Sequence, residues 1–283
     1  MEIRFTKMQG CGNDYVYIDG ASCGLTQEEK PGFVRFASDR HFGVGGDGVI
    51  FISPSSEADF EMEMYNADGS RSETCGNGIR CVAKYVHDKG MTDRDRFSII
   101  SGGQIKWMEL TVEGKETVAV RVDMGEPELD PEKIPVKASG SRAVDEPIEV
   151  NGKEYRMTCV SMGNPHAVVF ADGVEEMDLE KIGPGFENHE RFPRRINTEF
   201  VEIRDRSRVR MRVWERGTGE TLACGTGCCA TAVAGALNGL TDRKVTVEVT
   251  GGELFIDWDE ESNHVFMTGP ARFVFEGSLE WNG

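Results

Sequence analysis

Short glycine-containing motifs occur twice along this chain, in the same order and at nearly the same offset. Gly10-Cys11-Gly12-Asn13-Asp14 is followed 151 positions later, counted between the asparagines, by Met162-Gly163-Asn164-Pro165. Cys75-Gly76-Asn77-Gly78 returns 149 positions later as Cys224-Gly225-Thr226-Gly227. The pair Gly102-Gly103 also returns after 149 positions. One such match is expected by chance, but three in order predict two copies of one structural unit.

Each predicted copy starts with a strand and a helix and continues with strands joined by Gly-Gly hairpins. The runs 61–65 and 208–214 alternate apolar and charged residues, as half-buried strands do. Ten positions after each run comes a cysteine, followed by a stretch with apolar residues at helical spacing or nearly throughout. The pattern therefore predicts an α/β fold with mixed sheets, in which Cys75 and Cys224 occupy matching helix N-termini.

This placement makes Cys75 and Cys224 the candidate catalytic residues. A thiol at a helix N-terminus meets the positive end of the helix dipole, which lowers its pKa. The glycines that follow leave backbone N–H groups open to a bound carboxylate. If the two helix ends face one pocket, one thiolate can remove an α-proton while the opposite thiol delivers one, which inverts a stereocentre. Four other cysteines lie in apolar patterns and are predicted to be core residues: Cys81, Cys159, Cys228 and Cys229.

The charge and the motifs of the sequence argue against several other classes of protein. The net charge of −17 and the pI near 4.8 disfavour binding to nucleic acid or to an anionic membrane. Gly43-Val44-Gly45-Gly46-Asp47-Gly48 fits G-x-G-x-x-G, but it lies between a predicted helix and a strand, the reverse of the dinucleotide-binding order. The sequence has no C-x-x-C and no secretory signal pattern, which is typical of reduced thiols in the cytoplasm. We expect no cofactor and no metal.

The motif set resembles the diaminopimelate epimerase family over essentially the whole chain. The matching segments are 5–14, 65–70, 75–81, 160–166, 190–193, 214–221 and 223–227. The resemblance implies two pseudo-symmetric domains, each a curled mixed sheet around a central helix, with the active site in the cleft between them. It implies domains of 1–124 plus 272–283 and 125–271, since the C-terminal strand of the family returns to the first domain.

The resemblance also implies a function and a set of site residues. The family interconverts L,L- and meso-diaminopimelate without a cofactor, on the route to lysine and peptidoglycan, and its members are cytoplasmic and commonly homodimeric. Its catalytic thiols correspond to Cys75 and Cys224, and His166 and Glu215 match positions that adjust the thiol pKa values. Its substrate contacts correspond to Asn13, Asn66, Gly76, Asn77, Asn164, Asn197, Glu215, Arg216, Gly225 and Thr226. Gly48 stands where some members have a substrate-contacting glutamine, and Cys11 where leucine is common.

Three alternatives remain open at this point. A proline or hydroxyproline racemase-like enzyme would use the same chemistry on another substrate. Arg216 argues against it, because a bidentate guanidinium suits a second carboxylate that proline lacks. A non-catalytic amino-acid-binding relative and a redox or zinc protein are the other two.

Overall fold

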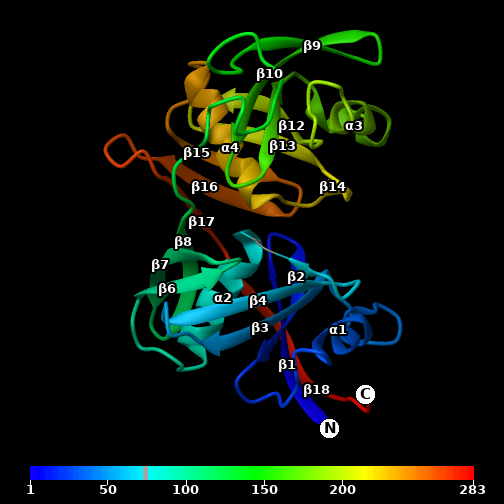
Figure 1. The fold of residues 1–283 in the computed structure, drawn as a ribbon. Helices are drawn as coiled ribbons and strands as arrows, with labels where there is room; N and C mark the ends of the chain where they lie inside the picture. The colour runs from blue at the N-terminus through cyan, green and yellow to red at the C-terminus, as the bar shows by residue number, and fades with distance from the viewer. Residues whose placement is uncertain (73–75) are drawn as a thin grey trace. The chain divides into compact units, whose positions relative to one another are not determined.

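The computed structural model describes residues 1–72 and 76–283 (Figure 1). The candidate catalytic residue Cys75 lies outside the described residues. Internal contacts divide the chain into two compact units, Met1–Val122 with Gly269–Gly283 and Asp123–Thr268. None of the helices within the described ranges has the length and apolar character needed to cross a membrane.

The first unit is a mixed sheet with two helices. Its elements are β1 (Glu2–Gly10), β2 (Asn13–Asp19), α1 (Lys30–Ser38), β3 (Gly48–Pro54), β4 (Phe60–Asn66), β5 (Arg71–Ser72), α2 (Gly76–Asp88), β6 (Arg96–Ser101), β7 (Gln104–Glu113), β8 (Glu116–Asp123) and β18 (Arg272–Glu280). The strands lie in the order β18-β1-β2-β3-β4-β6-β7-β8, and β5 pairs with β4. Only the β2–β3 and β4–β6 pairs of this set are parallel.

The second unit repeats this plan. Its elements are β9 (Glu146–Val150), β10 (Lys153–Ser161), β11 (Pro165–Phe170), the short 3₁₀ helix η1 (Val174–Glu176), α3 (Leu179–Glu187), β12 (Asn197–Asp205), β13 (Arg208–Glu215), β14 (Gly219–Thr221), α4 (Gly225–Leu237), β15 (Lys244–Val249), β16 (Gly252–Trp258) and β17 (Val265–Gly269). The order is β9-β10-β11-β12-β13-β15-β16-β17, with β14 on β13 and with β11–β12 and β13–β15 parallel. Every strand of the first unit thus has a counterpart here, and β18 takes the place of β9. The predicted repeat is confirmed.

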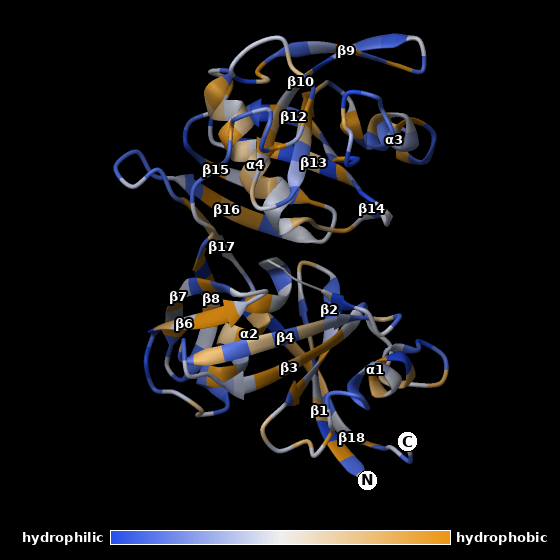
Figure 2. Cartoon of the chain, in the orientation of Figure 1, coloured by the Kyte–Doolittle hydropathy of each residue, from blue (hydrophilic) through white to orange (hydrophobic). Residues whose placement is uncertain are grey.

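In each unit the sheet curls around one long helix, as predicted. Helix α4 contacts β10, β11, β12, β15 and β16, and α2 contacts β1, β2, β6 and β7 (Figure 1). Helix α4 consists mostly of alanine, glycine and cysteine, and these small residues allow strands to approach it on several sides. The strand β3, apolar along nearly its whole length, is buried except at its last two residues (Figure 2). Burial of such uninterrupted apolar runs is the main source of stability in both units.

The shorter helix α1 packs on β2, β3 and β4, and α3 packs on β9, β12, β13 and β14. Helix α3 makes its contact with β13 through a glycine. Gly183 faces the Trp214 ring of β13, and an added Cβ would lie 2.2 Å from the ring atom Cδ2. Alanine is otherwise the better helix residue by about 1 kcal/mol. We nevertheless expect Gly183→Ala to lower the free energy of unfolding by about 1–3 kcal/mol, because the buried ring must move. Urea denaturation measures this change.

Gly140→Ala is the matched control for this prediction. Within 4 Å its added Cβ would meet one atom of the described residues, the Arg142 carbonyl oxygen at 3.7 Å, so the change should stay within about 0.5 kcal/mol. Equal unfolding midpoints for the two variants would contradict the close contact between α3 and Trp214.

Candidate active site

Cys224 is the N-cap residue of α4, in extended conformation. Its Sγ lies 3.5 Å from the Thr226 Oγ1, and the residue is 6% exposed. Glycine is required next to it, because a Cβ on Gly227 would lie 2.6 Å from Oε1 of Glu199 and 3.3 Å from the Cys224 Cβ. The sequence Cys-Gly-Thr-Gly thus places a thiol, a hydroxyl and a carboxylate close together at one helix end.

Two carboxylates dominate the electrostatics of this thiol. Burial, together with the negative charges of Glu215 and Glu199, raises the pKa of Cys224 well above its ordinary value. Hydrogen bonds from Thr226 and from the Gly227 backbone act in the opposite direction and are outweighed. The expectation that the helix N-terminus lowers the pKa of this cysteine is therefore wrong for Cys224. The protonated thiol is its resting form, which suits a proton donor.

Glu215, the last residue of β13, is the acid next to this thiol. Burial raises its pKa, while the hydroxyl of Thr221, the positive charge of His166 and a hydrogen bond with the Cys224 thiol act against that rise. Thr221 Oγ1 donates to Glu215 Oε1 at 2.5 Å. The carboxyl group is thus held in one position, in contact with the sulfur whose proton it can influence.

His166 and Glu199 form a fully buried pair beside Cys224. The imidazole Nδ1 lies 2.7 Å from Glu199 Oε1, both side chains are 0% exposed, and Nε2 lies 3.0 Å from the Asn164 Oδ1. The sequence analysis predicted that His166 lies near a thiol, but it did not identify Glu199 as a site residue. One feature could have identified it, because Glu199 is the single charged residue in the run Asn197–Val201.

His166, Glu199 and Cys224 also form the one grouping, among the described residues, with the makings of a metal site. Their ligand atoms lie within 4.8 Å of one another, and zinc accepts all three ligand types. Both imidazole nitrogens, however, lie within hydrogen-bond distance of Glu199 and Asn164. A metal would have to displace one of these partners, so the arrangement as it stands is better suited to moving protons.

The predicted substrate residues of the second unit gather around this cluster. Asn197 is buried and holds two segments together, since its Nδ2 donates to the Pro165 carbonyl at 2.9 Å and its Oδ1 accepts from the Arg216 backbone N–H at 2.9 Å. The Arg216 guanidinium donates to the Arg194 carbonyl at 2.9 Å. No carboxylate in the described parts of the chain forms an ion pair with it. A cation without a protein counter-ion suits a carboxylate ligand.

In the first unit the structure links Asn13 and Asn66 through a residue that the sequence analysis missed. Asn13 Nδ2 donates to the Asp47 Oδ2 at 2.7 Å, and the Asp47 carbonyl accepts from the Ala67 N–H at 3.0 Å. Asn66 ends β4, and its Nδ2 donates to the Ser70 Oγ at 3.0 Å. Asp47 therefore fixes the Asn13 amide and the turn after Asn66 together.

The start of α2 is held by a fully buried arginine. Arg80 donates from Nη2 to the Asn77 Oδ1 at 3.0 Å and from Nη1 to the Gly76 carbonyl at 3.2 Å. Cys11, with a positive φ of 53°, is buried with its sulfur 3.8 Å from Arg80 Nη2. Gly76 and Asn77 thus have fixed positions directly after Cys75 in the sequence.

The backbone at Gly48 has no room for a glutamine, the residue that the resemblance implies for some members. An added Cβ would lie 1.9 Å from the Tyr65 carbonyl oxygen and 2.9 Å from the Tyr15 ring. This backbone accommodates only glycine at that position.

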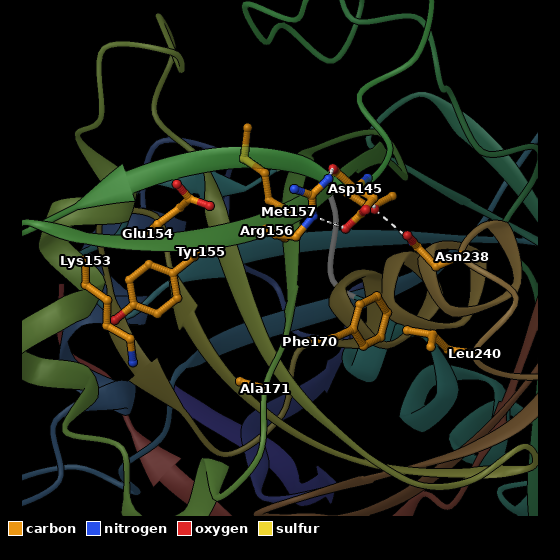
Figure 3. Close-up of a pocket in the computed structure, with 11 residues that line it drawn as sticks. Asp145, Lys153, Glu154, Tyr155, Arg156, Met157, Phe170, Ala171, Asn238 and Leu240 are labelled. Atoms are coloured by element: carbon orange, nitrogen blue, oxygen red, sulfur yellow. Dashed lines mark hydrogen bonds and ion pairs between the residues drawn. The ribbon is translucent and has the colours of Figure 1, made fainter.

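The pocket drawn in Figure 3 lies elsewhere in the second unit. It encloses about 490 Å³ between β10, the end of β11 and the loop after α4, and none of the predicted site residues lines it. Two of its charged groups, Arg156 and Asp145, form an ion pair with each other. Asn238 donates to the Thr158 Oγ1 at 2.8 Å. The pocket lacks the acid and base groups that surround Cys224.

The charge of Glu215 can be tested through the reactivity of Cys224. In Glu215→Gln the negative charge is gone, so we expect the pKa of Cys224 to fall. Alkylation of the thiolate by iodoacetamide should then begin at lower pH than in the unmodified sequence. Peptide mass spectrometry at a series of pH values measures the labelled fraction of Cys224.

Glu220→Gln is the control, because Glu220 is exposed and its carboxylate pairs with Arg212. It should leave the labelling curve of Cys224 in place, and Cys23, a half-buried thiol in a loop, serves as the internal reference. If the labelling curves of the Glu215→Gln variant and the unmodified protein superimpose, Glu215 does not raise the pKa of Cys224.

Comparison with known proteins identifies the family and the fold of this chain. The family model of diaminopimelate epimerase matches residues 5–129 and 158–274. A diaminopimelate epimerase from Acetivibrio thermocellus is 54% identical over 281 residues, which cover 99% of each chain. One from Methanococcus maripaludis is 54% identical over 279 residues, covering 98% of this chain and all of that one.

Solved structures with lower identity share the fold. A PhzF-family phenazine biosynthesis protein from Bacillus anthracis aligns with a TM-score of 0.72 at 16% identity, covering 99% of this chain and 100% of that one. A hydroxyproline epimerase from Agrobacterium vitis aligns with a TM-score of 0.70 at 11% identity, covering 98% and 92%. The fold is the two-domain mixed α/β fold of these proteins. By sequence, the chain belongs to the diaminopimelate epimerase family and is an enzyme of the isomerase type.

Proposed function

We propose that this protein interconverts L,L- and meso-diaminopimelate without a cofactor, with Cys75 and Cys224 as the two acid/base groups. The observation that carries the proposal is the buried Cys224 thiol at the N-terminus of α4, kept protonated by Glu215 and Glu199. Family membership supports the substrate, since relatives with more than half of their residues identical carry this name.

The proposed step exchanges one proton for another at a single carbon. The Cys75 thiolate takes the α-proton, and its S–H bond forms as the C–H bond breaks. The Cys224 thiol delivers its proton to the opposite face of the same carbon and becomes the thiolate. The reverse reaction uses the two groups in exchanged roles. Because the two thiols share one proton between them, their titration belongs to the pair.

The residues around Cys224 support both binding and charge stabilisation. The backbone N–H groups of Gly225 and Thr226, at the start of α4, suit the α-carboxylate, which carries part of the negative charge as the α-proton leaves. Arg216 has no carboxylate partner among the described residues and suits the distal carboxylate. Asn13, Asn66, Asn77, Asn164 and Asn197 are proposed to complete the contacts. The distal carboxylate distinguishes this substrate from proline.

The test is incubation of the reduced protein with L,L-diaminopimelate in D₂O. Proton NMR follows loss of the α-proton signal, and chiral chromatography follows the meso product. Exchange accompanied by meso product, and absent with proline, is the expected result. Exchange with proline alone would make the protein a proline racemase-like enzyme. Binding without exchange in demonstrably reduced protein would make it a non-catalytic relative.

We further propose that the protein acts as a cytoplasmic homodimer that supplies meso-diaminopimelate for lysine and peptidoglycan. Family membership is the support for this assignment. Light scattering on the purified protein should give twice the 31.3 kDa mass of the chain, and a mass equal to one chain would refute the dimer.

A further inference from the structure

Glu199 occupies a position where the twin unit has an apolar residue. On β12, Glu199 is paired with Val213 of β13 and Val168 of β11. In the first unit, Ile50 is paired in the same way with Met64 and Tyr17. The repeat offsets match these pairs one to one, since Val213 and Met64 are 149 positions apart, as are Glu199 and Ile50. The carboxylate is thus present in only one of two equivalent sites.

This difference has an energetic cost. Glu199 is 0% exposed, and its Oε2 has no hydrogen-bond partner among the residues that the structure describes. Burying a carboxylate costs several kcal/mol unless hydrogen bonds and an opposite charge offset it. Isoleucine fills the same place in the first unit without that cost. The cost of burying Glu199 therefore argues against a role in the stability of the fold and favours a role in the reaction at Cys224.

The partner of Glu199 indicates what that role is. An ionised carboxylate only accepts hydrogen bonds, so the 2.7 Å contact with ionised Glu199 is donated by His166 Nδ1. The Nε2 faces the Asn164 Oδ1, also an acceptor. The carboxylate thus sets the orientation of a ring that lies beside Glu215 and Cys224.

We propose that Glu199 is a positioning residue for proton transfer at Cys224: its carboxylate holds the His166 ring in one orientation, with a proton on Nδ1. This inference rests on the proposed function. The ionisable groups around Glu199 are His166 on β11, Glu215 on β13, Cys224 on α4 and the buried Cys159 on β10, and each of them interacts with Glu199 or with its neighbours. Loss of Glu199 frees the ring and alters the charge next to the thiol.

The first test uses the unliganded protein and needs no activity. With ¹⁵N-labelled histidine, NMR should show a proton on His166 Nδ1, with its proton signal shifted far downfield by the carboxylate. In Glu199→Gln this signal should move upfield or disappear through exchange. An unprotonated Nδ1 in the unmodified protein would overturn the proposal, whether or not any variant folds.

The second test is kinetic. We expect Glu199→Gln to lower kcat by about 10- to 100-fold, with KM within about threefold, and to shift the pH profile of kcat. Glu146→Gln is the control, since it also removes a buried carboxylate from the second unit, one that pairs with Arg191. It should lower stability without moving the pH profile.

The outcomes separate the two proposals. Unchanged kcat and pH profile in Glu199→Gln, beside an active unmodified enzyme, would overturn the positioning role alone. Absence of epimerisation in the unmodified protein would overturn the proposed function, while the NMR result would still decide whether Glu199 holds the His166 ring.

Discussion

Replacing Cys224 by serine is expected to lower kcat for diaminopimelate epimerisation by about 10³-fold or more, with little change in fold. A positioned acid/base group contributes about 10²- to 10⁴-fold to rate, and a serine hydroxyl is a much weaker acid than a thiol. The neighbouring Glu215 carboxylate further disfavours the alkoxide that serine would have to form. Initial rates in both directions, measured by chiral chromatography, give the loss.

The variant should also separate proton exchange from inversion. With Cys224→Ser, the proposed Cys75 thiolate can still remove and return the α-proton of one diastereomer on the same face. Deuterium should therefore enter that diastereomer from D₂O without formation of the other. Cys75→Ser should give the complementary result, with exchange confined to the opposite diastereomer.

Cys229→Ser is the control, because it makes the same exchange in the same helix at a residue that is 0% exposed and packed in the core. It should retain kcat within about twofold, with some loss of stability. Inversion at near-normal rates in Cys224→Ser, with the control behaving as expected, would rule out the two-thiol mechanism.

The repeat was accessible from sequence because the strands of both units follow the same order at a nearly constant spacing. Motif offsets of 149–151 residues survive where the residues between them have diverged, since glycines at turns and the first turn of a helix tolerate few replacements. The same reasoning placed Cys224 correctly at the start of α4. The glycine motifs at turns and helix starts were thus sufficient to predict the two repeated units.

The protonation state of Cys224 was not accessible in this way. A helix N-terminus is a local feature, and by itself it predicts a lowered pKa. The opposing groups, Glu199 and Glu215, lie on two strands, 25 and 9 positions away along the chain. Only the packing of β12 against α4 and the pairing of β13 with β12 bring them to the thiol. Glu199 resembles any other charged residue of β12 until the strand register shows which way it faces.

Arg80→Met is expected to cause the largest loss of stability among the substitutions considered. Arg80 is 0% exposed, and besides Asn77 and Gly76 its Nε donates to the Pro270 carbonyl at 3.2 Å. Methionine fills much of the volume but donates no hydrogen bond. Each buried acceptor left without a donor costs about 1–3 kcal/mol, so the free energy of unfolding should fall by about 3 kcal/mol or more. Urea denaturation measures this loss.

Arg94→Met provides the matched control in the same unit. The Arg94 side chain is 56% exposed and pairs with Asp59 at the surface, where such ion pairs contribute at most about 1 kcal/mol. A stability loss in Arg80→Met no larger than in Arg94→Met would mean that the buried guanidinium does not hold the start of α2. Where the variant remains folded, KM for diaminopimelate should rise more than kcat falls, because Asn77, a proposed substrate contact, loses its hydrogen bond from Arg80.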